Sequence, residues 1–494
     1  MAGRFRAVSR EKVADAALAD KLHAATATSL EKYAAIVANT PHWQQLRDRA
    51  RQVKLHTLTH LDQYLGQFVK TTEANGANVF WADTGRDACE YVVDLARRRG
   101  VTRATKAKSM TGEEIEINHA LTRAGVEPVE TDLGEMICQL AGDTPSHVTA
   151  PIIHWSMEEV ARLLKEKGIT AEIPAELSRV GAPEPAAPAS QKPAQYSVQM
   201  PAPSSENRHA LRVAAAAKLV AAARKALREK FLTAGMGISG ANFAVAESGS
   251  VVVIENEANI RLTTTLPPIH VAIVGIEKLI PKLSDLATFL SLLPVAATGQ
   301  RQSGYVSIIH RPFGELHIVL LDNGRSRLLA DKEHFDLLSC IRCGACMNVC
   351  PVYRHVSGHG YGAIYPGPIG AVLMPHLRDE EQFKELPFAS SLCGACAEIC
   401  PVRIPLDERL LQWRDRVVSA GGRPKLEAAA FAVWAWLMRH PGLYRGGRPP
   451  ASWMEALSSL AGPARNWRLT REMPPVAPET FAQWWERNRA ARED

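Results

Sequence analysis

Apolar residues in the first 70 positions recur at the spacing of an amphipathic helix. Two stretches show this spacing, Leu22, Ala25 and Leu30 and then Leu55, Leu58 and Leu61. Residues three or four apart share one face of a helix, so the pattern predicts helices that pack through one side. We therefore expect residues 1–70 to form a helical N-terminal segment with no catalytic groups of its own.

The pattern then changes to alternating strands and helices. Three short runs predict strands, at 78–82, 103–108 and 126–131. An amphipathic helix is expected at 87–98, and a second at 113–124, with Thr111 and Glu114 forming a capping box at its start. Strand–helix alternation of this kind predicts a mostly parallel sheet with helices on its faces.

The α/β pattern is interrupted once. Residues 181–205 hold six prolines and six alanines, which is typical of a flexible insertion. A helix rich in Ala, Lys and Arg is expected at 208–232. Strand-like runs follow, at 250–255, 270–276, 304–310 and 315–321. The pattern therefore predicts one α/β domain over residues 71–325.

Composition excludes several classes of protein. Of the 494 residues, 46% are hydrophobic and 22% are charged, which excludes collagen-like, coiled-coil and wholly disordered chains. The net charge of +6 is small for this length, and no nucleic-acid-binding module is recognisable. The longest nearly apolar run, 428–438, has 11 residues, far short of the roughly 20 that span a bilayer. The N-terminus lacks the apolar core of a secretory signal. We expect a cytoplasmic protein, with peripheral contact at the inner membrane face as an alternative.

Seven of the nine cysteines lie in two tight runs. The first run is Cys340-x2-Cys343-x2-Cys346-x3-Cys350-Pro, and the second is Cys393-x2-Cys396-x3-Cys400-Pro. The first spacing is that of bacterial-ferredoxin iron–sulfur ligands. A structural zinc site usually uses two separated pairs of ligands, so the triple spacing favours iron–sulfur clusters. Cys89 and Cys138 fall within helical patterns and are expected to be small buried hydrophobes.

In the ferredoxin pattern the last cysteine of each run ligates the other cluster. This crossing assigns cluster 1 to Cys340, Cys343, Cys346 and Cys400, and cluster 2 to Cys350, Cys393 and Cys396. Ser390 stands where the second run would have its first cysteine. Cluster 2 is therefore either [3Fe-4S], or [4Fe-4S] with Ser390, water, another side chain or a partner group at its fourth iron.

The two runs are separated by enough chain to form helices. From Cys350 to Cys393 is 393 − 350 = 43 residues, which favours an α-helical ferredoxin-type domain over residues 330–410. The Gly- and Pro-rich stretch 358–370 is expected to be an irregular loop over the clusters. Residues 411–494 hold seven of the ten tryptophans and predict a helical segment that packs against its own core or a partner.

Other motifs carry weaker signals. Gly235–Gly240 matches G-x-G-x-x-G, but a helix precedes it and a strand follows it, so dinucleotide binding is not expected. Several polar residues could line a pocket, although structural roles are expected for most of them: His355, His359, Glu130, Asp132, Glu247 and Thr263–Thr265. The sequence identifies no catalytic residue and leaves the enzyme class open.

Four segments of the α/β region, joined to the cysteine runs, resemble one family. The segments are 108–118, 130–135, 237–249 and 315–325. Together with the cysteine runs they are similar to LutB-type lactate-utilisation iron–sulfur proteins. The resemblance covers about residues 60–440, and the Pro/Ala insertion at 181–205 is its one departure.

The resemblance implies both a fold and a role. The fold is a LUD domain, similar to the NagB/RpiA/CoA-transferase group, fused to a ferredoxin-type domain. The role is an electron-transfer subunit in a three-protein system that oxidises L-lactate to pyruvate and allows growth on lactate. The alternative is a self-contained oxidoreductase that binds an organic acid or thioester in the LUD pocket. A regulatory protein that uses its clusters as redox or iron sensors has the least support.

Overall fold

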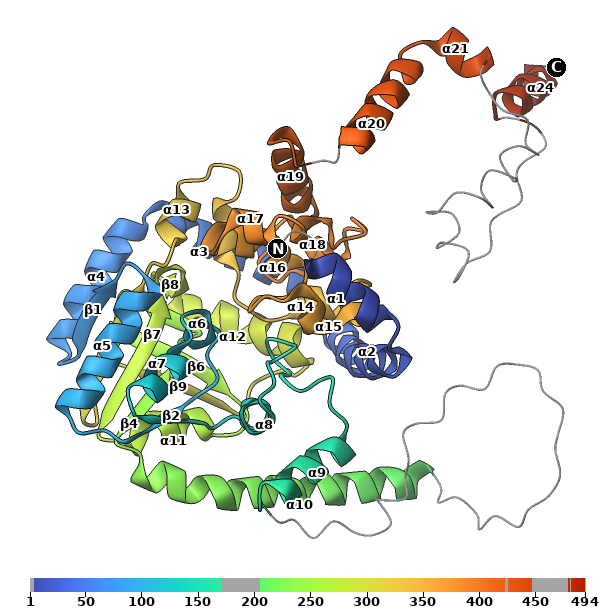
Figure 1. Cartoon of the computed structure of the whole chain (residues 1–494). Helices are drawn as coiled ribbons and strands as arrows, with labels where there is room; N and C mark the ends of the chain where they lie inside the picture. Colours follow the sequence, from blue (N-terminus) through green and yellow to red (C-terminus); the bar gives the residue numbers. More distant parts are fainter. Residues whose placement is uncertain (1–3, 170–204, 423–424, 447–478, 480, 494) are drawn as a thin grey trace, which may run out of the picture. The chain divides into compact units, whose positions relative to one another are not determined.

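The computed structural model describes residues 4–169, 205–422, 425–446, 479 and 481–493 (Figure 1). Residues up to Arg416 form one compact unit, and the residues from Val417 onward form another. The predicted flexible insertion lies outside the described residues, apart from residue 205, which begins a helix.

The N-terminal segment is helical, as its periodicity predicts. It comprises α1 (Arg4–Val13), α2 (Ala16–Ala38), α3 (Trp43–Thr59) and α4 (Leu61–Ala74). Figure 1 shows α1 and α2 beside helices of the cysteine-rich region, and they contact α15 (Tyr353–Tyr361). Helix α4 instead packs on the sheet through Leu61 and Phe68.

A six-stranded parallel sheet forms the centre of the α/β domain. Its strand order is β1-β10-β7-β4-β2-β3. The strands are β1 (Asn78–Ala82), β2 (Arg103–Lys106), β3 (Glu127–Glu130), β4 (Met236–Ser239), β7 (Ile269–Gly275) and β10 (Glu315–Leu321). A smaller sheet, ordered β8-β5-β6-β9, comprises β5 (Phe243–Val245), β6 (Ser250–Glu255), β8 (Leu279–Ile280) and β9 (Tyr305–Ile309). The predicted α/β fold is confirmed, although the sequence pattern did not indicate β4, β5 or β8.

The central strands are buried on both faces because helices cover each side. All seven residues of β7 are buried. Its residues Val271 and Ile273 face the core beneath α5 (Gly85–Arg98), whereas Ala272 and Val274 face the core shared with α4. Successive strand residues point to opposite faces, so one apolar run serves both cores.

The remaining helices of this domain flank the two sheets. They are α6 (Met110–Glu114), α7 (Ile117–Arg123), α8 (Leu133–Ala141), α9 (Met157–Glu166), α10 (Ser205–Thr233), α11 (Asn259–Thr265), α12 (Leu283–Thr298), α13 (Arg325–Leu329) and the 3₁₀ turn η1 (Ile276–Lys278). Helix α10 confirms the helix expected at 208–232.

The capping box expected at Thr111 and Glu114 was wrong. The side chain of Ser109 caps α6 by accepting from the Gly112 N–H at 3.1 Å, and the helix ends at Glu114. A second short helix, α7, follows a left-handed Glu116. Glu114 is unavailable as a local cap because a distant arginine, Arg325, pairs with its carboxylate.

The cysteine-rich region is made of short helices, as the ferredoxin-type prediction requires. They are η2 (Phe335–Ser339), α14 (Ala345–Asn348), α15, α16 (Gly367–Leu377), α17 (Glu380–Phe383), η3 (Leu386–Phe388), α18 (Ala395–Ile399) and α19 (Leu406–Ser419). The irregular loop expected at 358–370 is shorter than predicted. Helix α15, which is kinked at Ser357, runs to Tyr361 and α16 begins at Gly367, so that only residues 362–366 are non-helical. The glycines there permit close packing, since a Cβ on Gly370 would lie 1.6 Å from the Tyr365 carbonyl oxygen.

A buried ion network joins the α/β domain to this region. Arg325, with no exposed surface, donates to both carboxylate oxygens of Glu114 at 2.8 Å and to Glu277 at 2.6 Å. The Tyr365 hydroxyl donates to Glu114 at 2.6 Å. Arg342, between the first two cysteines, lies 3.7 Å from Glu277. These contacts join residues of the α/β domain to Arg342 and Tyr365 of the cysteine-rich region, through two carboxylates and two guanidinium groups.

The second unit has three described helices, α20 (Lys425–Met438), α21 (Pro441–Gly446) and α24 (Phe481–Glu493). Helix α20 has no buried residue, and Trp434 and Trp436 are exposed along it. Packing of this helix on a core of its own is therefore not seen among the described residues. Trp453 and Trp467 lie outside them. Within the described chain, no helix is both long and apolar enough to cross a membrane.

Replacing Glu114 by Gln tests how much the ion network contributes to the stability of the fold. Loss of the charge leaves Arg325 underpaired in the interior, so we expect the free energy of unfolding to fall by about 3 kcal/mol. Urea unfolding of the anaerobically purified protein measures this change. Glu116→Gln, two residues along and exposed, is the matched control and should unfold like the parent. Equal stability of both variants would contradict the role given to the network.

Candidate iron–sulfur site

The first cysteine run is a loop that wraps around the start of a short helix. Arg342 and Gly344 both have left-handed backbones, with φ of 59° and 79°. The turn at Gly344 begins α14, which carries Cys346. The Arg342 N–H donates to Cys340 Sγ at 3.4 Å. The run therefore curls its backbone around its own sulfur atoms, as a cluster-binding loop does.

The second run repeats this geometry. Leu392 and Gly394 have φ of 54° and 78°, and Gly394 begins α18. The Leu392 N–H donates to Ser390 Oγ at 3.1 Å, as the Arg342 N–H does to Cys340 Sγ. Ser390 is thus the local counterpart of Cys340, with a hydroxyl in place of the thiol.

The four cysteines assigned to cluster 1 line one cavity. Cys340, Cys343, Cys346 and Cys400 surround it together with apolar side chains such as Ile369 and Leu406. Helices α14 and α18, one from each run, contact each other beside it. Four thiols around a largely apolar cavity fit an iron–sulfur cluster, because sulfur is the ligand such clusters take and burial limits solvent access.

The three cysteines assigned to cluster 2 differ in exposure. Cys350 and Cys396 are buried, whereas Cys393 is exposed. Burial, and then the neighbouring Cys350, raises the pKa of Cys396 to about 12. The Ala395 N–H lowers the pKa of Cys393. The second group of thiols therefore reaches the protein surface on its Cys393 side.

An arginine from the N-terminal helices holds the second run in place. Arg47 is 5% exposed, and its Nε and Nη2 donate to the Cys400 carbonyl at 3.1 and 2.8 Å. The sequence patterns described above did not indicate this contact of Arg47. A signal was present, because Trp43, Arg47 and Ala50 share one helical stripe, and a basic residue in an apolar stripe indicates a buried partner.

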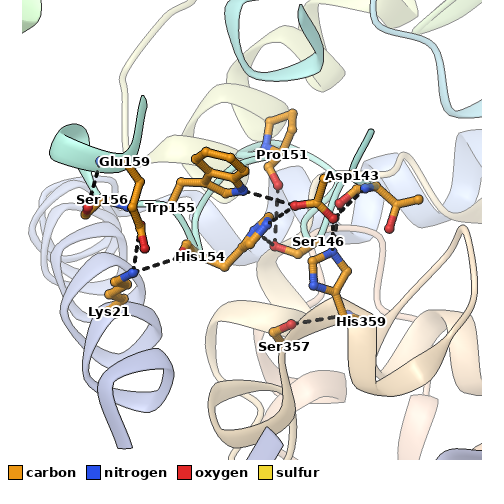
Figure 2. Close-up of polar contacts among 11 residues, drawn as sticks. Lys21, Asp143, Ser146, Pro151, His154, Trp155, Ser156, Glu159, Ser357 and His359 are labelled. Atoms are coloured by element: carbon orange, nitrogen blue, oxygen red, sulfur yellow. Dashed lines mark hydrogen bonds and ion pairs between the residues drawn. The ribbon is translucent and has the colours of Figure 1, made fainter. Parts of the chain in front are cut away.

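A second contact joins the α/β domain to α15 (Figure 2). Asp143 accepts from His154 at 2.8 Å and from Trp155 at 3.0 Å. His359 on α15 donates to the Thr144 carbonyl at 2.7 Å and lies 3.6 Å from Asp143. The Tyr353 hydroxyl donates to the Ser146 carbonyl at 2.8 Å. His359 therefore anchors this loop, whereas His355 packs edge-on against His23.

One cavity of the α/β domain adjoins the cluster 1 cavity. Lys108, Asp132 and Lys278 line it, and Arg342 lines both cavities. Of the other polar candidates, Glu247 accepts from the Leu283 N–H at 3.0 Å outside this pocket. The candidate Thr263–Thr265 also lies outside the lining, on α11. Of the polar residues singled out in the α/β domain, Asp132 is thus the one that reaches the pocket.

The glycine motif at 235–240 forms strand β4 rather than a phosphate-binding loop. A Cβ on Gly237 would lie 1.8 Å from the Thr263 carbonyl oxygen, and one on Gly240 would lie 2.5 Å from Ser109 Oγ. The glycines therefore allow α11 and the start of α6 to approach the strand. This close packing explains the motif without a dinucleotide.

Glu130 belongs to a buried charge cluster beside the pocket. Lys106 donates to Glu130 at 2.7 Å and to Glu113 at 2.6 Å. Burial alone would lower the pKa of Lys106, but these two carboxylates raise it above its usual value. Burial raises the pKa of nearby Glu135 to about 8. Burial also raises the pKa of Glu130, so this carboxylate cluster keeps a proton at neutral pH.

The fold and the paired cysteine loops define a LUD domain fused to a 4Fe-4S dicluster domain. The LUD domain model matches residues 65–326, the 4Fe-4S dicluster domain model matches 336–404, and the model described as lactate utilisation protein B, C-terminal, matches 416–490. The chain is 39% identical over 464 residues to the uncharacterized electron transport protein YkgF of Escherichia coli (strain K12), covering 91% of this chain and 89% of that protein. It is 38% identical over 463 residues to lactate utilization protein B of Bacillus pumilus (strain SAFR-032), covering 90% and 89%. The chain belongs to the lactate utilisation protein B family.

A solved structure offers a weaker likeness. The crystal structure of a DUF162 family protein from Deinococcus radiodurans aligns with 53% of this chain and 98% of its own, at 11% identity and a TM-score of 0.24.

The raised pKa of Glu135 predicts a pH-dependent stability. The folded pKa of about 8 lies above the unfolded value, so the folded state holds a proton that the unfolded state has lost. The stability from this group is therefore present at low pH and lost as the pH rises towards 8. Glu135→Gln has no carboxyl group to ionise at this position and so lacks this pH dependence of stability.

We expect the stability of the parent protein to fall relative to the Gln variant by about 2 kcal/mol between pH 6 and pH 8. Urea unfolding at both pH values measures the difference. Glu73→Gln, at an exposed position of α4, should show no such trend. A constant difference between the parent and Glu135→Gln would show that Glu135 is ionised throughout.

Proposed function

We propose that the protein is an iron–sulfur electron-transfer component of a system that oxidises L-lactate to pyruvate. The observation that carries this proposal is the cavity lined by Cys340, Cys343, Cys346 and Cys400. The match to a 4Fe-4S dicluster domain supports the cofactor, and relatives named lactate utilization protein B support the substrate. When bound, the clusters supply single-electron transfer.

The proposed ligand sets follow the crossing pattern. Cluster 1 takes the four cysteines of the cavity, and cluster 2 takes Cys350, Cys393 and Cys396. We assign Ser390 to the fourth corner of cluster 2, because it accepts an N–H bond as Cys340 does in the first run. Gly344 and Gly394 let the backbone turn closely around these sites.

A partner protein would approach from the cluster 2 side. Cys393 is the exposed member of the seven cysteines, whereas Cys340 is half-buried and the other five are buried. Electron transfer between proteins needs a donor or acceptor near the surface, and this side provides one. The proposed partners are the other proteins of a three-component lactate-utilisation system, working in the cytoplasm or at the inner membrane face.

Cysteine variants test the ligand sets. Cys343→Ser should remove the EPR signal of one reduced cluster, and Cys396→Ser the signal of the other, since each takes away a thiolate from a different set. Anaerobic purification with iron analysis is the measurement, and about eight irons are expected in the parent. Cys138→Ser, buried in α8 and away from both runs, is the control and should keep both signals. Zinc in place of iron would overturn the proposal.

Growth on L-lactate tests the role in the cell. Deletion of the gene should abolish growth on L-lactate in a strain without another lactate dehydrogenase. The parent gene and Cys138→Ser should restore growth, and Cys343→Ser should not. Unimpaired growth of the deletion strain would refute the role in lactate use.

The alternative, a self-contained oxidoreductase, is favoured by one observation. The α/β pocket and the cluster 1 cavity share Arg342 as a wall. Reduction of a dye by purified protein and L-lactate, with no other component present, would support this alternative. Dye reduction that requires the partner proteins would support the electron-transfer component.

A further inference from the structure

The pocket of the α/β domain lies where such sheets bind ligands. It is lined by residues that directly follow β2 and β4, among them Lys108 and Asn242. In chain order, β2 is followed in this sheet by β3, which lies on one side of the β2–β4 pair. Strand β4 is followed by β7, which lies on the other side. The pocket is therefore at a topological switch point, beyond the carboxyl ends of the strands. Its volume of about 280 Å³ suits a small molecule.

The cations in the pocket lack hydrogen-bond acceptors. Neither terminal nitrogen of Arg342 has one, and its nearest carboxylate, Glu277, is 3.7 Å away. Among the described residues, the ammonium groups of Lys108 and Lys278 form no hydrogen bond or ion pair. Burial lowers the pKa of both lysines, that of Lys278 to about 8. Lys278 is buried and Lys108 is half-buried. Cations that are partly removed from water and lack hydrogen-bond acceptors are costly, and a bound anion would offset part of that cost.

The acidic groups of the pocket are engaged elsewhere. Asp132 accepts from the Gly134 and Glu135 N–H groups at the start of α8. Glu255 accepts from the Ile260 and Arg261 N–H groups at the start of α11. Burial raises the pKa of Glu255 and of Glu257, which also lines the pocket. The carboxylates form no hydrogen bond with the lysines. Asp132 and Glu257 favour the charged form of Lys108 against the effect of burial, and they make the lining unfavourable for a multiply charged anion.

We propose that this pocket binds a small monocarboxylate through Lys108, Lys278 and Arg342, directly beside the cluster 1 cavity. A single carboxylate provides acceptors for these cations without a large excess of negative charge near Asp132 and Glu257. Val148, Ile341 and Arg342 line both cavities, so one layer of side chains separates the bound acid from cluster 1. That the acid is a 2-hydroxy or 2-oxo acid rests on the proposed function; that it is a monocarboxylate rests on the pocket.

Calorimetric titration of the anaerobically purified, iron-loaded protein tests the site. The probes are L-lactate, pyruvate and inorganic phosphate. We expect L-lactate or pyruvate to bind, and phosphate to bind at least tenfold more weakly. Lys278→Met should weaken carboxylate binding about tenfold to a hundredfold, the range for loss of a charge-assisted hydrogen bond. Lys278→Arg keeps the charge and should retain part of the affinity.

The matched control is Lys282→Met, four residues along and exposed. It should bind like the parent, and all variants should keep the parent iron content, which shows that they are folded. Tighter binding of phosphate than of the carboxylates, or equal carboxylate binding by Lys278→Met and the parent, would overturn the site. If the protein holds both clusters and restores growth on L-lactate but binds no carboxylate, the proposed site is refuted and the proposed function is not. Absence of iron would instead overturn the proposed function.

Discussion

The interaction on which the rest of the structure depends is the buried pairing of Arg325 with Glu114 and Glu277. A guanidinium with no exposed surface is costly to bury, and only a full set of acceptors makes it tolerable. Here the acceptors come from two carboxylates that belong to different parts of the α/β domain. Tyr365, from the cysteine-rich region, adds a bond to Glu114. The network therefore forms only when both regions are in place.

This constraint also sets the position of the first cysteine loop. Arg342 stacks over the Tyr365 ring at 4.5 Å and faces Glu277 at 3.7 Å. Against the effect of burial, Arg325, Lys278 and Arg342 together lower the pKa of Glu277 to about 2, although neither terminal nitrogen of Arg342 donates a hydrogen bond. Because Arg342 lies between Cys340 and Cys343, the network positions the loop that lines the cluster 1 cavity. The same side chain then forms a wall of the α/β pocket.

The sequence was informative where function depends on local spacing. The cysteine spacing indicated four thiols that line one cavity, because such spacing is set by a few consecutive residues. The role of Ser390 at the second cluster stays a prediction. Local patterns failed where a distant residue decides the outcome. The Thr111–Glu114 motif resembles a capping box, yet Arg325, more than two hundred positions away, takes the carboxylate. Likewise, Arg47 reaches Cys400 only because the N-terminal helices fold back onto the second run.

The arrangement of sites along the molecule has a physical logic. The α/β pocket is lined by both cations and carboxylates, whereas the adjoining cysteine cavity is largely apolar. Cys393 is exposed, whereas three of the four thiols assigned to cluster 1 are buried and the fourth, Cys340, is half-buried. An anion held in the pocket would stay close to cluster 1 yet separated from its sulfurs by Val148, Ile341 and Arg342. If the acid binds as proposed and a partner docks at Cys393, the two contacts use different residues of the protein, so that a docked partner need not block the pocket.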